Sequence, residues 1–328
     1  MEPTLGIFAI GEHSAASLAA HSYCALDRPL RIGAELWVAV ATDHATIVGA
    51  FVRATGFPEG TRLARRGSGG PSVHVGPGTI HVALSMTRPG VLYGSDSRRI
   101  VNRSVRPLLR ALTRFTSGAY YFGRDWVAAA HRPAAWVGFG HDASTGRTLF
   151  EAFVAVSVPI APGPMASSRG RLPTTLEAIA GHELDPISVA QAIVESYAHG
   201  TNTVPLEAVS ESSVLACPVP APMIELPWTA TRDEAIGVLG AGPDSSGKFR
   251  VGGDLLASRD AIRRLETRAG LSDSEDGIAR AVDEELGAPG VVVDGVRNLA
   301  CIADVIARAR GFDSQPNRSR SFPMNDRR

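Results

Sequence analysis

A short stretch rich in arginine and glycine restricts what this chain can fold into more than any other feature. Arg65 and Arg66 are adjacent and lead into a Gly-Ser-Gly-Gly turn, and a second glycine turn covers residues 76–79. Glycine pairs let a backbone approach a ligand closely because no Cβ intervenes, and successive free N–H groups form a concavity that binds anions. Two guanidinium groups add planar forks for carboxylate or phosphate. The stretch therefore predicts an anion-binding loop, with a surface hairpin carrying incidental arginines as the alternative.

Short β-rich segments flank this loop on both sides. Residues 36–41 and 45–53 precede it, and residues 73–75 and 79–85 follow with the alternation typical of paired strands. This order resembles the catalytic domain of the lipoate–protein ligase and octanoyltransferase family, which is related in fold to biotin protein ligase. In that family a Val-Val-Gly-like strand precedes an Arg-Arg-x-Ser/Thr-Gly-Gly turn, and a Gly-Asn/Thr strand start follows.

The resemblance extends over roughly residues 36–197 and implies the fold class. It predicts an α+β fold, with a mixed β-sheet of the biotin/lipoate ligase type, flanking helices and a small C-terminal α+β accessory domain. Helices are expected over residues 14–28, 102–117 and 185–197, the last capped by Asp185 with Pro186 at its first position. We expect a catalytic domain over residues 1–204, a Pro-rich linker over 205–230, the accessory domain over 231–312 and a disordered tail over 313–328.

Composition excludes several classes of protein. The chain has 33 basic and 33 acidic residues, so its formal charge is zero and it lacks the basic surplus of a nucleic-acid binder. No apolar run approaches the length of a membrane span. The three cysteines, Cys24, Cys217 and Cys301, are scattered and predict inert thiols rather than a disulfide framework. A reducing cytoplasm suits this pattern best, and no histidine group has the spacing of a metal site.

The resemblance also implies a chemistry. Members of the family activate lipoate or octanoate with ATP, or take the acyl group from acyl carrier protein, and pass it to one lysine of a lipoyl carrier domain, of the dehydrogenase E2 or glycine-cleavage H type. ATP and Mg²⁺ are the expected cofactors of a ligase, and an apolar slot lined by Val73, Val82, Leu84, Val154 and Val156 is expected to hold the acyl chain. The positions implied to bind substrate and adenylate are Arg65, Arg66, Ser68, Gly69, Gly70, Val73, His74, Gly78, Thr79 and Asp125.

One position departs from the family pattern. The family carries a lysine seven residues beyond the strand-starting aspartate, and counting from Asp125 leads to Arg132. Arginine retains the charge, but its flat guanidinium does not shuttle protons. We therefore expect Arg132 or His131 to act in place of the lysine, with His74 and His81 as further candidate bases or ordinary strand histidines.

Two alternatives follow from the missing lysine. The chain is either an enzyme for a different carboxylate, or a non-catalytic paralogue or partner subunit that binds an acyl group or a nucleotide. A biotin ligase is disfavoured because the Gly-Arg-Gly-Arg loop of those enzymes does not occur here.

Overall fold

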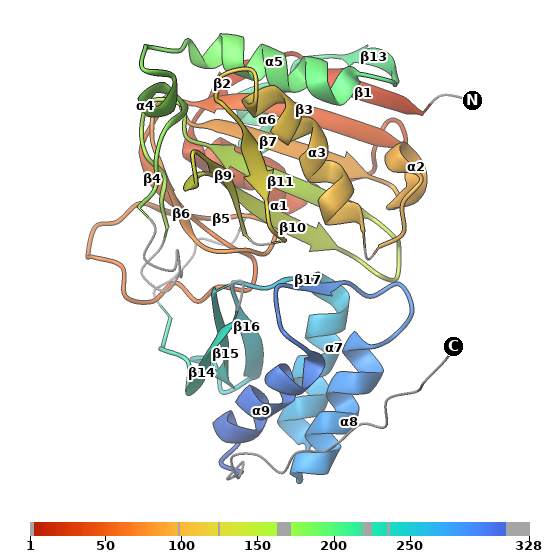
Figure 1. The fold of residues 1–328 in the computed structure, drawn as a ribbon. Helices are drawn as coiled ribbons and strands as arrows, with labels where there is room; N and C mark the ends of the chain where they lie inside the picture. The colour runs from red at the N-terminus through yellow and green to blue at the C-terminus, as the bar shows by residue number, and fades with distance from the viewer. Residues whose placement is uncertain are drawn as a thin grey trace, which may run out of the picture.

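A computed structural model describes residues 3–97, 99–123, 125–162, 172–217, 219, 225–234 and 237–312 of this chain. An 11-stranded mixed sheet organises it, with the central order β13-β1-β3-β7-β11-β10-β17-β18 and with β2 beside β3, β9 beside β10 and β8 beside β9. Figure 1 shows this sheet across the upper part of the molecule. Its strands are β1 Thr4–Phe8, β2 Gly11–His13, β3 Ala34–Ala41, β7 Ile80–Met86, β8 Ala119–Tyr121, β9 Trp126–Ala129, β10 Arg132–His141, β11 Thr148–Val154, β13 Asn202–Leu206, β17 Leu256–Ser258 and β18 Val293–Asp294.

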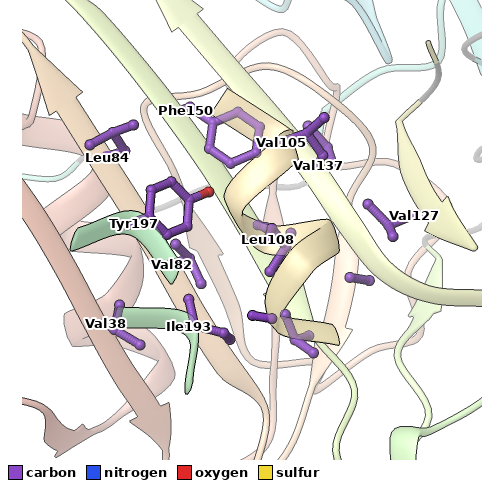
Figure 2. Packing of buried hydrophobic residues seen from close by; sticks show 14 of the residues in the cluster. Val38, Val82, Leu84, Val105, Leu108, Val127, Val137, Phe150, Ile193 and Tyr197 are labelled. Atoms are coloured by element: carbon purple, nitrogen blue, oxygen red, sulfur yellow. The ribbon is translucent and has the colours of Figure 1, made fainter. Parts of the chain in front are cut away.

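Every residue of β3, β7 and β11 is buried, because both faces of the sheet are covered. On one face lie α3, Ile100–Leu112, and α5, Pro186–Ala198, together with the short helices α2, Gly90–Tyr93, and α4, Leu176–Ala180. Figure 2 shows the packing there, with Tyr197 and Ile193 of α5 near Val82 of the sheet. The Tyr197 hydroxyl donates a hydrogen bond of 2.8 Å to the Ser104 carbonyl and so joins α5 to α3.

The opposite face is covered by α1, Ala15–Cys24, and by a small four-stranded sheet. That sheet consists of β4 Ala45–Val48, β5 Leu63–Arg65, β6 Val73–Val75 and β12 Ala161–Pro162. A second apolar core fills the space between it and the main sheet, with Trp37, Trp136 and Phe153 among its largest members. The main sheet therefore separates two distinct cores.

The accessory unit has its own core and lies at the other end of the molecule (Figure 1). A three-stranded antiparallel sheet, β14 Ala230–Glu234, β15 Gly237–Pro243 and β16 Phe249–Gly253, precedes the helices α7 Arg259–Leu271, α8 Glu275–Leu286 and α9 Leu299–Ala309. The Pro-Asp-Ser-Ser-Gly sequence of residues 243–247 has the composition of a hairpin turn, and it joins β15 to β16. Between β16 and α7, β17 pairs with β10, so the unit is joined to the main sheet through backbone hydrogen bonds.

The N-terminal cap expected from the sequence is present at one helix and displaced at another. Asp185 accepts hydrogen bonds from the Ile187 and Ser188 amides, as expected for the start of α5. Ser272 and Glu275 have the spacing of a capping box, but the cap of α8 is Ser274, whose side chain accepts from the Gly277 amide.

Part of the predicted linker, residues 205–230, forms a strand and a helix. Its first two residues, Pro205 and Leu206, end β13, which pairs in parallel with β1, and α6 covers Glu211–Leu215. Cys24 and Cys217 form a disulfide, with their Cα atoms 6.7 Å apart, so the prediction that both are inert thiols is wrong. Only Cys301 is free among the three cysteines. The predicted disordered tail lies outside the described residues.

Candidate functional site

The turn at residues 66–71, here called the glycine loop, is held by hydrogen bonds to distant parts of the chain. The Gly67 amide donates to Ser22 Oγ at 2.9 Å, the Gly69 amide to the Phe139 carbonyl at 2.8 Å and the Gly70 amide to the Leu255 carbonyl at 2.8 Å. A Cβ at Gly69 would lie 2.0 Å from the Leu255 oxygen, so only glycine permits this approach. These amides, which the sequence suggested as anion donors, are engaged within the protein.

Arg66 braces the same loop from inside. Its side chain is 1% exposed, and its Nη2 donates to the carbonyls of Gly69 and Pro71, each at 2.9 Å. Burial lowers the pKa of Arg66 to about 10, although the charges of Glu151, Asp254 and Asp125 oppose this shift. The guanidinium therefore points into the protein rather than toward solvent, and its Nη2 donates its hydrogen bonds to carbonyls of its own loop.

A buried polar network lies behind Arg66. Glu151 Oε1 is 2.6 Å from His81 Nε2, and Ser22 Oγ donates to Glu151 Oε2 at 2.7 Å. Sequence reasoning treated His81 as a strand histidine or a base and did not single out Glu151. The available signal was a lone acid within the apolar segment 148–154, which β11 buries completely.

Arg65 is the more accessible of the two adjacent arginines. It donates to the carbonyls of Gly49 at 3.0 Å and Val52 at 2.8 Å, and pairs with Glu225 at 3.1 Å. Beside it is a cavity of about 310 Å³, here called the interdomain cleft, whose lining combines residues near the glycine loop with residues of β16 and α7. The fold thus forms a cavity next to the two arginines, and the accessory unit supplies one of its walls.

Arg132 occupies a different place. The turn between β9 and β10 consists of Ala130 and His131, whose φ angles are 46° and 62°. Arg132 is the first residue of β10 and is exposed; it donates to the Leu172 carbonyl at 3.2 Å and the Pro173 carbonyl at 2.7 Å. His131 is likewise exposed on this turn, whereas Asp125 is 1% exposed.

The two predicted parts of the site are separated along β10. An ideal Cβ on Gly138 would lie 2.3 Å from Ser68 Oγ, so the glycine loop packs at this point of the strand. Gly138 is six residues beyond Arg132, which corresponds to roughly 20 Å of extended strand. Arg132 and the interdomain cleft therefore do not form one compact site.

Three further residues predicted to bind substrate have structural contacts near β6 and β7. Thr79 is buried and its Oγ1 accepts from the Gly76 amide at 3.2 Å, while Gly78 adopts a φ of 82° in that turn. His74 is exposed, with its Nδ1 3.1 Å from Thr46 Oγ1. Thr79 and Gly78 build the turn before β7, and His74 lies in β6, an inner strand of the small sheet.

The predicted acyl slot is not formed by the residues proposed for it. Val82, Leu84, Val154 and Val156 belong to the core beneath α3 and α5, whereas Val73 belongs to the core on the other side of the sheet. All five are 0% exposed. Because the sheet lies between the two groups, they cannot line one common slot, and this prediction is wrong.

Comparison with known structures identifies the fold. LipL1 of P. falciparum, solved in complex with lipoate, superposes with a TM-score of 0.62 at 10% identity, covering 95% of this chain and 100% of that one. The chain has the fold of the lipoate–protein ligases. This lipoate-ligase fold confirms the predicted α+β class with its mixed sheet and flanking helices.

Two further structures of this fold match over a smaller part of the chain. The bipartite lipoate–protein ligase of Thermoplasma acidophilum, studied with its E2 lipoyl domain, has a TM-score of 0.49 at 16% identity, covering 66% of this chain and 91% of that one. A lipoate–protein ligase A bound with ATP has a TM-score of 0.48 at 15% identity, covering 66% and 93%. No protein-family model and no curated protein sequence matches the chain.

Other possible sites receive no support from the described residues. Within them, no group of three or more His, Cys, Asp or Glu side chains converges on a metal position. In the same part of the chain, no helix has both the length and the apolar content that a membrane span requires.

Proposed function

We propose that this protein is an acyl ligase or acyltransferase that attaches lipoate or octanoate to a lysine of a lipoyl carrier domain. The observation that carries the proposal is the match to LipL1, which covers nearly the whole chain and whose structure contains lipoate. The arginine in place of the family lysine is the exposed first residue of β10, whose other residues are buried, and at that position a cation can reach substrate oxygens.

The proposed chemistry requires an activated acid. In the ligase reaction a carboxylate oxygen attacks the α-phosphorus of ATP, pyrophosphate leaves, and the carrier lysine then attacks the acyl carbon and releases AMP. In the transferase reaction the same amine displaces the thiol of an acyl carrier protein. Arg132 is proposed to stabilise the negative charge that develops on the acyl and phosphate oxygens, which its planar fork suits.

Supporting roles fall to the other predicted positions. His131 is proposed to accept a proton from the carrier lysine. Mg²⁺ would enter bound to the phosphates of ATP, which is the usual way this ion reaches a nucleotide site. A role in holding substrate or adenylate remains proposed for Arg65, Arg66, Ser68, Gly69, Gly70, Val73, His74, Gly78, Thr79 and Asp125. A cytoplasmic location also remains proposed, but the Cys24–Cys217 disulfide removes the argument from unpaired cysteines on which it was based.

Two assays test the proposal. The protein is incubated with ATP, Mg²⁺ and either lipoate or octanoate, with and without a lipoyl domain, and AMP and the mass of the domain are measured. A parallel reaction replaces ATP and free acid with octanoyl carrier protein. A mass increase equal to one acyl group supports the proposal, and the reaction that produces it distinguishes ligase from transferase.

Variants at Arg132 connect the activity to the structure. Arg132→Ala should lower kcat/KM at least about a hundredfold, as loss of a donor to a developing charge does in other enzymes. Arg132→Lys, which restores the family residue, should retain or raise activity. Arg280→Ala, which changes an exposed arginine on α8, is the control and should leave activity unchanged.

The second candidate is a binding protein without catalysis, which the absence of the lysine favours. This candidate predicts that neither assay gives an acylated lipoyl domain, and that calorimetry shows saturable binding of lipoate or octanoate. An active wild-type protein excludes this alternative.

A further inference from the structure

Positive charge is concentrated between residues 97 and 141, although the whole chain has as many acidic as basic residues. This segment contains eight arginines and one acid, which is buried. At the end of α3, α5 engages two of the arginines: Arg114 pairs with Glu195 at 2.7 Å, and Arg110 donates to the Ser196 carbonyl at 2.9 Å. The arginines at the beginning of α3 are in a different situation.

The side chains of Arg99, Arg103 and Arg106 make no hydrogen bond or ion pair with any described residue. Arg99 and Arg106 are exposed, and Arg103 is half-buried. The first turn of α3 holds no acid, so Arg99 and Arg103 lie near the positive end of the helix dipole, where a cation does not stabilise the helix. Asp96, which precedes α3, accepts from the Arg99 amide at 3.0 Å. Three guanidinium groups are therefore available to a partner.

These arginines line a cavity between α3 and β8, here called the α3 groove. Its volume is about 510 Å³, and its lining also includes Asn102 and Tyr121. The Tyr121 hydroxyl is buried and has no hydrogen-bond partner in the part of the chain that the structure describes. Burial raises the pKa of Tyr121, and the charges of Asp294 and Asp125 act in the same direction, so the hydroxyl stays a neutral donor. The groove thus combines guanidinium groups with an unsatisfied donor, and both bind carboxylates.

Strand β8 connects the groove to the proposed acyl site. Ala119 of β8 pairs with Ala129 of β9, and Ala129 pairs with Arg132 at the start of β10. Two strand spacings correspond to about 10 Å. Tyr120, the next residue of β8, is 48% exposed and stacks on His131, with the ring centroids 6.3 Å apart. A standard interface covers about 800 Å² of each partner, so one docked domain can cover both the groove and Arg132.

We propose that the α3 groove is the docking surface for the carrier domain that is acylated at Arg132, and that this domain is acidic. The inference rests on the proposed function and adds the place and the chemistry of carrier binding. Arg99, Arg103 and Arg106 pair with carboxylates of the domain, and Tyr120 packs against the surface beside its lysine. Arginine and tyrosine are among the residues that contribute most to binding at interfaces, and an excess of Asp and Glu complements the charge of the groove.

The test measures binding of a lipoyl domain to the whole chain by calorimetry. The probe is an E2-type lipoyl domain with a negative formal charge, and its acceptor lysine is replaced by alanine so that binding is separated from acylation. The variants are Arg106→Glu and Arg103→Glu/Arg106→Glu. Arginine and glutamate have similar helix propensities, and an acid near the start of α3 suits the helix dipole, so both variants should fold. The matched control is Arg280→Glu, an exposed arginine of α8.

At low ionic strength the wild type should bind the domain with a Kd below about 100 μM. Arg106→Glu should weaken binding about fivefold and the double variant about twentyfold, because charge reversal adds repulsion. Added salt should weaken wild-type binding, and Arg280→Glu should bind as the wild type does. Absence of binding overturns the proposal, as does binding that the double variant retains. The proposal also fails if a DNA duplex binds in place of the domain and depends on the same arginines.

Acylation of a domain that keeps its lysine separates this proposal from the proposed function. The double variant should raise KM for the domain at least about tenfold while kcat stays within about twofold, since the change acts on docking. Arg132→Ala should lower turnover and leave binding of the domain unchanged. A wild type that binds the domain through the groove but transfers no acyl group refutes the proposed function alone. A wild type that acylates the domain with a KM that the double variant shares refutes the docking surface alone.

Discussion

His81 Nε2 lies 2.6 Å from Glu151 Oε1 between two strands of the central sheet, and neither side chain is exposed. Ser22 of α1 donates to the second oxygen of Glu151, and the charge of Arg66 acts on the same carboxylate. Burial raises the pKa of Glu151, but the hydrogen bond and charge of His81 and the charge of Arg66 outweigh it, so the pKa lies below its usual value. The carboxylate thus joins α1, β7 and β11 to the glycine loop.

Replacing Glu151 with glutamine should therefore destabilise the fold. The amide preserves the shape but removes the negative charge and leaves Arg66 without its principal buried counter-charge, and breaking a buried pair typically costs about 3–5 kcal/mol. Urea unfolding followed by circular dichroism measures the change. Glu207→Gln, at an exposed position, is the control and should change the unfolding free energy by less than about 0.5 kcal/mol. Equal stability of the two variants would show that the network does not support the fold.

Arg66→Lys tests whether the guanidinium braces the loop. A single ammonium cannot reproduce the planar contacts to the Gly69 and Pro71 carbonyls, so we expect a loss of about 2–3 kcal/mol, the range for hydrogen bonds to charged groups. Thermal unfolding monitors the effect. Arg62→Lys is the matched substitution, because the Arg62 side chain is 67% exposed in its pair with Asp43 and its change should be near zero. An Arg66→Lys protein as stable as wild type would contradict the bracing role.

Features determined by nearby residues could be predicted from the sequence. The start of α5 follows from an aspartate cap and a proline, and the β15–β16 hairpin from a Pro-Asp-Ser-Ser-Gly turn between strands. The order of strands around the glycine loop was sufficient to indicate the fold class.

Features determined by distant residues could not be predicted. The glycine loop was expected to offer free amides, but their acceptors come from Ser22, Phe139 and Leu255, which no local pattern connects to it. Hydrophobicity does not distinguish the residues of the predicted acyl slot. The face of the sheet on which each of them lies depends on strand register, and a shift of one residue moves every side chain to the other face. The pairing of Cys24 with Cys217 depends on where the segment after β13 returns to α1.

The Cys24–Cys217 disulfide should contribute to stability. It closes a loop with a sequence separation of 193 residues, and chain-entropy arguments assign a loop of this length about 5 kcal/mol. Mass spectrometry without reductant should show two hydrogens fewer than with it, and reduction should lower the unfolding temperature. The variant Cys24→Ser/Cys217→Ser should behave as the reduced wild type and become insensitive to reductant. A mass that shows three free thiols in protein purified under oxidising conditions would refute the pairing.

Asp254 should make the stability of the protein depend on pH. Burial raises its pKa to about 7, against the hydrogen bond from the Val238 amide and the charge of Arg66, whereas an unfolded aspartate has a pKa of about 3.9. Between these values the folded state holds a proton that the unfolded state has lost. The contribution of Asp254 is therefore fully present below about pH 4 and is lost as the pH rises through about 7, with a slope near 1.4 kcal/mol per pH unit.

Asp254→Asn should abolish this dependence, because an amide does not titrate and its oxygen can still accept from the Val238 amide. Unfolding free energies measured at intervals from pH 5 to 8 should fall more steeply with rising pH for the wild type than for the variant. Asp233→Asn, an exposed change in the neighbouring strand β14, should retain the wild-type slope. Parallel curves for wild type and Asp254→Asn would show that Asp254 is ionised in the folded protein throughout this range. The positive charge of Arg66 would then have to stabilise the carboxylate that is buried beside Gly237.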